Sequence, residues 1–232
     1  MAGQQDRAPL LTDGQVAGSV ALQRFLARPV LDVAPALLGA VIEHHTAAGV
    51  VAVRLTEVEA YAGPGDPGSH ARNGPTPRTA VMFGPPARLY VYFSYGMHWC
   101  VNVVCGPVGS ASAVLLRGGE VVRGLELART RRPAARQDRD LARGPARLAS
   151  ALGLDKSLDG AALGGSRSSS AVRLRRSGRV AGEVCTGPRV GVSGVGGDAV
   201  RYPWRFWLDG EPTVSTYRPG ATRSEPGRDA SP

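Results

Sequence analysis

Two carboxylates and a tyrosine recur at every second residue in the first third of the chain: Glu57, Glu59 and Tyr61. The residues before them, from Val50, alternate as in a β-strand, and side chains two apart in a strand lie on one face, about 6.5 to 7 Å from each other. A carboxylate held against an aromatic ring can act as a general base, because partial burial and a fixed position tune its proton affinity. Spacing alone favours the plainer alternative of a solvated strand edge with an ion pair to Arg54.

A histidine that could contact a ligand, His70, lies in the segment 62–86, which is rich in Gly, Pro, Asn and Thr and too long for a simple turn. Loops of this length often carry function. Beside Tyr61 its ring could stack on a planar ligand, whereas a lone loop histidine is otherwise simply solvated. The spacing of the four histidines and three cysteines matches no zinc pattern, so we expect no bound metal.

Two alternating runs between residues 89 and 105 flank the tetrapeptide Tyr95-Gly96-Met97-His98 and predict a β-hairpin. Turn chemistry favours Asn and Gly, so Tyr95 and Met97 are unusual at such a tip. Exposed apolar side chains there could act as a wedge between stacked bases. The equally weighted alternative is that the tip packs against the segment 62–86 as ordinary core.

The 28 Lys and Arg residues outnumber the 19 Asp and Glu residues, which gives a formal net charge of +9 and favours a polyanionic partner. Arginines gather in the segments 123–147 and 167–179. Guanidinium groups bind phosphate oxygens through forked hydrogen bonds, so nucleic acid is one interpretation. The alternative is a solvated charged surface in a protein whose arginine-rich composition reflects the base composition of its genome.

Periodicity and turn residues predict an α+β fold with many strands in one domain, and no repeat or linker divides the chain. The 31 glycines and 18 prolines predict short elements joined by many turns. Besides the hairpin, we expect two short helices between residues 21 and 45, helices over 124–132 and 144–154, and strands over 50–61, 111–117, 172–176, 189–192 and 204–208. The polar ends, 1–18 and 217–232, are expected to be disordered, so the domain spans 19–216.

No apolar run approaches the roughly 20 residues that span a bilayer, and the polar residues 4–7 interrupt a secretory start. The three cysteines form no C-x-x-C pair and leave an odd thiol, so a disulfide framework is not indicated. We therefore expect a cytoplasmic protein that does not enter the membrane.

A series of motifs in one order closely resembles the alkyladenine DNA glycosylase family, the mammalian-type 3-methyladenine DNA glycosylases. The motifs are Thr56 to Tyr61, Asp66 to Arg72, Thr76-Pro77-Arg78, Leu89 to Tyr92, Tyr95-Gly96-Met97 and Asn102. The resemblance covers roughly residues 22 to 216. It implies a single α+β domain built on a curved antiparallel sheet or open barrel, with helices around it and a protruding β-hairpin.

The resemblance also implies a role for each matching residue. Glu59 would be the general base that activates a water. A flipped base would stack in a pocket of Tyr61, His70 and Tyr92, and Asn102 would exclude the exocyclic amino group of guanine. Tyr95, with Met97 beside it, would intercalate into DNA, and Arg117 would hold the flipped nucleotide or the water. One departure is His98, where the mammalian members have a tyrosine.

The implied enzyme flips alkylated or deaminated purines (3-methyladenine, 7-methylguanine, hypoxanthine or etheno-adenine) from duplex DNA and hydrolyses the N-glycosidic bond, leaving an abasic site. An N-alkylated purine is cationic and leaves readily, so one carboxylate suffices, and no lysine beside Glu59 offers a Schiff-base lyase step. We expect no metal or organic cofactor, a monomer on double-stranded DNA, and a place at the nucleoid if the source is bacterial. The alternatives are a catalytically silent binder of distorted duplexes and, least favoured, a carbohydrate hydrolase that uses Glu57 and Glu59.

Overall fold

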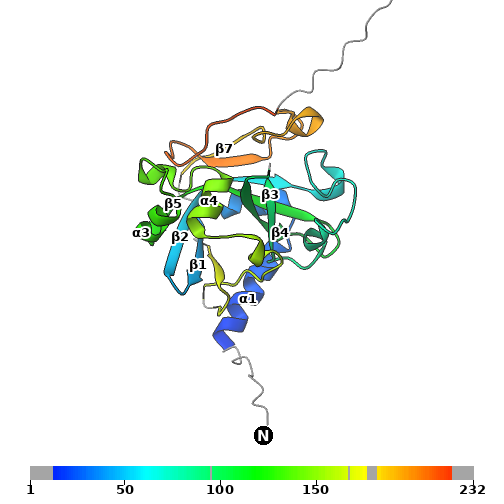
Figure 1. The fold of residues 1–232 in the computed structure, drawn as a ribbon. Helices are drawn as coiled ribbons and strands as arrows, with labels where there is room; N and C mark the ends of the chain where they lie inside the picture. Colours follow the sequence, from blue (N-terminus) through cyan, green and yellow to red (C-terminus); the bar gives the residue numbers. More distant parts are fainter. Residues whose placement is uncertain (1–12, 95, 167, 177–181, 221–232) are drawn as a thin grey trace, which may run out of the picture.

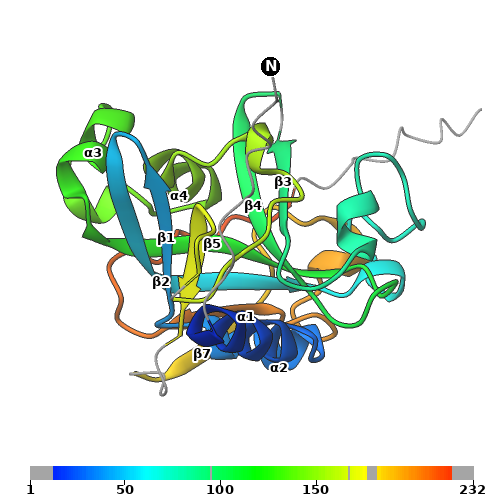
Figure 2. The ribbon, with the colours of Figure 1, turned by 90° about the horizontal axis from the view of Figure 1, so that it is seen from below.

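An antiparallel sheet of eight strands organises the part of the chain that the computed structural model describes, residues 13–94, 96–166, 168–176 and 182–220. The sheet curls into a half-barrel with a few helices around it (Figure 1), which confirms the predicted α+β class. The strand order is β3-β4-β5-β2-β1-β6, with β8 pairing to β2 and β7 to β8. In Figure 2, α1 and α2 lie together on one side of the sheet, and α3 and α4 lie together on the other.

The strands are β1 (Val41–Thr46), β2 (Gly49–Tyr61), β3 (Leu89–Ser94), β4 (His98–Cys105), β5 (Ser112–Arg123), β6 (Val172–Arg175), β7 (Val184–Gly187) and β8 (Arg205–Leu208). The α-helices are α1 (Asp13–Leu26), α2 (Val30–Val33), α3 (Leu125–Arg131) and α4 (Pro145–Leu152). Single 3₁₀ turns occur at Pro35–Leu37, Gly63–Gly65, Ala80–Phe83, Asp138–Asp140, Lys156–Leu158 and Gly194–Gly197.

The long strand β2 is the centre of the sheet. Val51, Val53 and Leu55 alternate along it and are fully buried, so the hydrophobic effect fixes which face of the strand turns inward. Strand β5 runs along one side of β2, while the other side pairs first with β1 and then, from Glu57 to Glu59, with β8. The two carboxylates therefore lie where β2 exchanges one neighbour for another.

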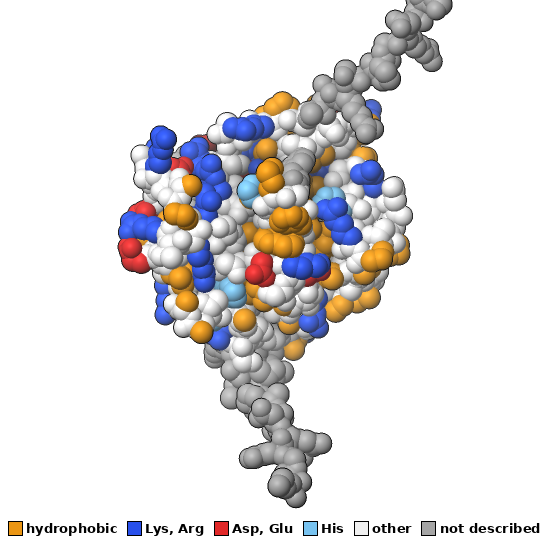
Figure 3. All heavy atoms as spheres, viewed as in Figure 1, with side chains coloured by type: hydrophobic (Ala, Val, Ile, Leu, Met, Phe, Trp, Pro, Cys, Tyr) orange, Lys and Arg blue, Asp and Glu red, His pale blue; other side chains and the backbone are white. Residues whose placement is uncertain are grey.

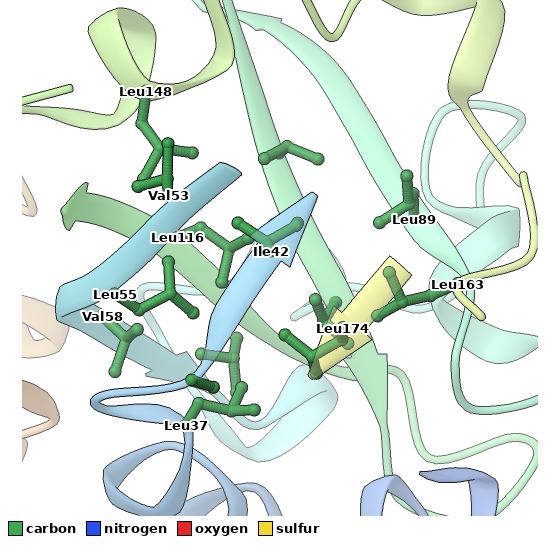
Figure 4. Packing of buried hydrophobic residues seen from close by; sticks show 14 of the residues in the cluster. Leu37, Ile42, Val53, Leu55, Val58, Leu89, Leu116, Leu148, Leu163 and Leu174 are labelled. Atoms are coloured by element: carbon green, nitrogen blue, oxygen red, sulfur yellow. The ribbon is translucent and has the colours of Figure 1, made fainter. Parts of the chain in front are cut away.

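The core lies between the sheet and its helices and is almost entirely aliphatic. Figure 4 shows Leu148 of α4 against Val53, and Leu116 of β5 near Ile42 of β1. These side chains are all fully buried. Burying a leucine or isoleucine stabilises the fold by about 1.5–3 kcal/mol. This packing therefore fixes the positions of β2 and β5, which carry Glu59 and Arg117.

Most elements predicted from periodicity are present. Strand β2 starts one residue before the predicted range 50–61, and β3 and β4 form the predicted hairpin. Helix α4 ends at Leu152, and the φ of 72° at the following Gly153 is a left-handed conformation that glycine adopts without strain. The predicted strand over 189–192 is wrong, because those residues form a turn around Gly191, with φ 72°. The strand in that region is instead β7, which the sequence analysis missed.

The described part of the chain extends on both sides of the predicted domain limits, 19 and 216. Helix α1 begins at Asp13, and its residues Leu22, Phe25 and Leu26 are buried. The second predicted helix is short, and β1 already begins at Val41. Residues 217–220 are described and contact the body of the protein, whereas residues 1–12 and 221–232 lie outside the described part. No helix in the described part of the chain is long and apolar enough to cross a bilayer.

Candidate active site

A cavity of about 640 Å³ opens between the end of β2, the loop that follows it, the β3–β4 hairpin and the turn at residues 190–193. The six residues predicted for catalysis, base binding and nucleotide binding all line it: Glu59, Tyr61, His70, Tyr92, Asn102 and Arg117. Of the two predicted intercalating residues, Met97 is at the hairpin tip, 67% exposed, and is not part of the cavity lining. Tyr95 lies outside the described residues.

Glu59 is fully buried, and two hydrogen bonds and one ion pair hold its carboxylate. Its Oε1 accepts a hydrogen bond from the Val190 backbone N–H at 2.7 Å and lies 3.3 Å from Nη1 of Arg117. Its Oε2 accepts from the Tyr61 hydroxyl at 2.8 Å. Burial and the neighbouring Glu59 charge raise the pKa of Tyr61, so this hydroxyl stays protonated and remains a donor. The result is a carboxylate of fixed orientation in a cavity wall.

Glu57 is also fully buried, so the solvated strand edge favoured by spacing alone is wrong for both carboxylates. It forms ion pairs with Arg117 at 2.9 Å and Arg205 at 2.7 Å. Burial alone would raise the pKa of Glu57, but the charges of Arg117 and Arg205 outweigh that effect and lower it. Arg54, the expected ion-pair partner of these carboxylates, instead pairs with Glu120 and Glu211.

Aromatic side chains form one wall of the cavity. The ring of His70 meets that of Tyr92 edge-on, with centroids 4.6 Å apart, and the Tyr90 and Tyr92 rings stack at 5.5 Å. His70 Nδ1 also lies 3.3 Å from the Tyr90 hydroxyl. The surrounding protein and the charges of Arg78 and Arg72 lower the pKa of His70 to about 4. His70 is therefore a neutral ring at physiological pH and offers a flat partner to a planar ligand.

Asn102 lies on β4 beside the aromatic wall, where it pairs with Tyr90 of β3. Its side chain is almost completely buried, and its Nδ2 donates to the Tyr90 carbonyl at 3.1 Å. This hydrogen bond links the amide to the neighbouring strand and fixes its orientation. A rigid amide can discriminate between ligands by the groups it clashes with or leaves unpaired.

A buried ion pair that the sequence analysis missed joins two segments that line the cavity. Arg189 donates from Nη1 and Nη2 to the two carboxylate oxygens of Asp66, at 2.6 and 2.7 Å, and both residues are fully buried. The same guanidinium lies 4.6 Å from the Tyr61 ring centroid. A Cβ on Gly68 would approach Arg189 Nη2 to 2.4 Å, so only glycine fits there. The pair joins the loop after β2 to the turn at 190–193.

Three arginines surround the mouth of the cavity: Arg72, Arg78 and Arg218. Arg78 lies 5.5 Å from the Tyr92 ring centroid. Arg218 belongs to the segment predicted to be disordered, yet its carbonyl accepts from the Gly191 N–H at 2.9 Å. None of the three takes part in an ion pair between described residues. The mouth is therefore positively charged.

The hairpin next to the cavity exposes apolar surface. Phe93 is 45% exposed and packs on Trp99, with ring centroids 4.6 Å apart. Figure 3 shows apolar side chains gathered over β3 and β4, with Lys and Arg side chains around them. An apolar ridge within a basic surface suits a partner that presents both stacked rings and phosphates.

The site contains no set of side chains typical of a metal centre. Across residues 13–220, apart from the gaps at 95, 167 and 177–181, no three His, Cys, Asp or Glu side chains converge as metal ligands would.

A family model and individual relatives identify the same family. The family model described as methylpurine-DNA glycosylase (MPG) matches residues 24–212. A protein of Streptomyces avermitilis is 57% identical over 196 residues, 84% of this chain and 91% of its own length. One of Leifsonia xyli is 58% identical over 193 residues (81% and 88%), and one of Frankia casuarinae is 54% identical over 221 residues (90% and 96%). All three bear the name "Putative 3-methyladenine DNA glycosylase".

Proposed function

The chain belongs to the methylpurine-DNA glycosylase family, and we propose that it removes damaged purines from duplex DNA by base flipping and attack of a water activated by Glu59. It is a DNA N-glycosylase, a hydrolase of DNA repair. The relatives are bacterial, so we place the reaction in the cytoplasm, where bacterial DNA lies. The substrate class we propose is alkylated or deaminated purines: 3-methyladenine, 7-methylguanine, hypoxanthine and etheno-adenine.

The single observation that carries this proposal is the Glu59 carboxylate, held by two hydrogen bonds and one ion pair in the wall of a cavity. Cleavage of an N-glycosidic bond passes through an oxocarbenium-like state, which a nearby carboxylate stabilises. The same carboxylate accepts a proton from water as the water attacks the anomeric carbon, and the base departs with the bond electrons. Arg117, at 3.3 Å from Glu59, is placed to orient that water or a phosphate of the flipped nucleotide.

The aromatic wall supports recognition of a flipped base. Tyr61, Tyr92 and the neutral ring of His70 would stack on a purine, and base–aromatic stacking contributes about 1–3 kcal/mol per base. Asn102 would reject the exocyclic amino group of undamaged guanine. Met97, exposed at the hairpin tip, would enter the DNA beside Tyr95 and fill the space that the base leaves.

The carbohydrate hydrolase is disfavoured by the position of Glu57. Such an enzyme uses two carboxyl groups that flank the scissile bond. Glu57 does not line the cavity, and its carboxylate accepts hydrogen bonds from Arg117, Arg205 and a backbone N–H. Only one of the two carboxylates is therefore available to a substrate.

The test is a single-turnover base-release assay on labelled duplexes carrying one hypoxanthine or one etheno-adenine, with EDTA present and alkali added to reveal abasic sites. We expect alkali-dependent cleavage by the parent chain. Glu59→Gln keeps the shape of the side chain but removes the base, so release should fall by about 10²- to 10⁴-fold while lesion binding persists. Glu120→Gln, a change of the same type at an exposed site of β5, is the control and should behave as the parent.

Two outcomes would contradict this proposal. Full activity of Glu59→Gln would remove Glu59 from the role of base. Tight binding by the parent without release of any of these bases, or of methylated bases, would support the catalytically silent duplex binder instead.

A further inference from the structure

A segment near the C-terminal end, residues 211–218, contacts β2 beside the candidate active site; we call it the strap. It runs in the same region as β7 (Figure 1), and all of it after residue 212 lies beyond the family match. Glu211 accepts two hydrogen bonds from Arg54, at 2.8 and 3.0 Å. The hydroxyl groups of Thr213 and Thr56 lie 2.8 Å apart. The strap is thereby fastened along the outer face of β2.

The centre of the strap binds Glu57. The Ser215 backbone N–H donates to Oε2 of Glu57 at 2.7 Å, and the Ser215 hydroxyl donates to Oε1 at 2.9 Å. Oε1 also accepts from Nε of Arg117 at 2.9 Å and Nε of Arg205 at 2.7 Å. A buried carboxylate with four donors is fixed in place, because turning it in any direction leaves a buried polar group unpaired.

A glycine on the neighbouring strand permits this close approach. Gly118 of β5 pairs with Glu57 in the sheet. A Cβ at this position would lie 2.8 Å from the Thr213 carbonyl oxygen and 3.1 Å from Oε2 of Glu57. Any side chain at Gly118 would push the strap away, and Ser215 could no longer reach Glu57.

Arg117 connects Glu57 to Glu59. Its Nε is bound to Glu57, its Nη2 donates to the Ser215 hydroxyl at 3.2 Å, and its Nη1 lies 3.3 Å from Oε1 of Glu59. The guanidinium is almost completely buried. Two of its nitrogens are thus held by Glu57 and the strap, and only the third faces the carboxylate proposed as the base.

We propose that Glu57 is a positioning residue for base release: with Ser215, it holds Arg117 so that only one nitrogen approaches Glu59. This inference rests on the proposed function. Without Glu57, Glu59 would be the nearest carboxylate to Arg117, and the planar guanidinium would turn to bind it through two nitrogens. Oε2 of Glu59, which already accepts from the Tyr61 hydroxyl, would then also accept from Arg117, and no acceptor site on that oxygen would remain for the attacking water.

The experiment compares Glu57→Gln and Ser215→Ala with the parent and with Glu120→Gln as control, in the single-turnover assay and in lesion binding. We expect binding within about threefold of the parent and base release slowed about 10²-fold for Glu57→Gln, the loss typical of a misplaced reacting group. Ser215→Ala keeps its backbone N–H and all charges, so a smaller loss is expected. It also carries the test if Glu57→Gln fails to fold.

The same substitutions in an Arg117→Met background separate positioning from a merely structural role. If Glu57 acts through Arg117, Ser215→Ala and Glu57→Gln should slow release no further in that background. Losses that multiply in the double variants, or variants as active as Glu120→Gln, would overturn the inference. A parent chain without base release would instead contradict the proposed function, so the two failures are distinguishable.

Discussion

The candidate active site and the arginine-rich segment 123–147 contain the same chemical groups in opposite surroundings. Around the cavity, three carboxylates and three guanidinium groups are buried and balance in charge: Glu57, Glu59, Asp66, Arg117, Arg189 and Arg205. In the arginine-rich segment, Arg129 pairs with Glu126 and Asp138, and all three side chains are about half exposed or more. Water and salt screen the second set but hardly affect the first.

This difference indicates where electrostatics fixes structure in this protein. A buried ion pair gains little over an apolar pair, but removal of one partner leaves an unpaired charge inside the protein. The buried set therefore restricts Glu59 and the loops around it to one arrangement. The exposed set contributes charge to the surface without fixing geometry.

The largest effect is expected when one charge of the buried set is removed. Asp66→Asn leaves Arg189 fully buried without its ionic partner and should lower the free energy of unfolding by about 3–5 kcal/mol, as measured by urea titration of the full chain. Asp138→Asn, the same change in the exposed pair with Arg129, should leave stability unchanged within error. Equal effects of the two substitutions would contradict the distinction between the two regions.

The sequence predicted the site better than it predicted what supports the site. Glu59 and Tyr61 follow from a period of two, a local property of one strand, and His70 is a candidate from its place in the long loop. The resemblance added Tyr92, Asn102 and Arg117. The burial of Glu57 could not be foreseen, because Arg205 and Ser215 lie 148 and 158 residues away along the chain. Local periodicity contains no information about such partners.

The same limit explains the errors of the fold prediction. The alternating residues 189–192 resemble a strand, but Arg189 is buried in an ion pair with Asp66. This partner lies 123 residues earlier in the chain, so local periodicity could not indicate it. The residues around it therefore form a turn. The four residues of β7 lack a regular apolar alternation, and pairing with β8 alone makes them a strand.

A smaller effect on the free energy of unfolding is expected when acid protonates Glu57, a member of the buried set. The arginines beside Glu57 lower its pKa below the ordinary value of 4.5. Its contribution to stability is therefore complete above pH 4.5 and is lost as the pH falls through the folded-state pKa. Each pH unit between the pKa of the unfolded chain and that of the folded protein corresponds to about 1.4 kcal/mol. Urea titrations between pH 6 and 3 should show a steeper acid loss in the parent than in Glu57→Gln, and parallel curves would contradict a lowered pKa.

The smallest expected effect is on the salt dependence of DNA affinity, and it compares two exposed arginines, Arg218 and Arg129. Arg218 lines the cavity mouth outside any ion pair between described residues, whereas Arg129 already binds two acids. Each phosphate contact releases counterions and adds about 0.9 to the slope of log affinity against log salt. In a Glu59→Gln background, which should bind lesion DNA without turnover, Arg218→Ala should lower that slope by about one contact.

The smaller slope expected for Arg218→Ala corresponds to about a threefold smaller change in affinity between 50 and 200 mM salt. Arg129→Ala is the control, and its slope should equal that of the background, because the acids beside Arg129 compete with phosphate for its guanidinium. If Arg129→Ala lowered the slope and Arg218→Ala did not, DNA would contact the arginine-rich segment rather than the cavity mouth. Arg218, at the cavity mouth, would then have no part in binding the DNA.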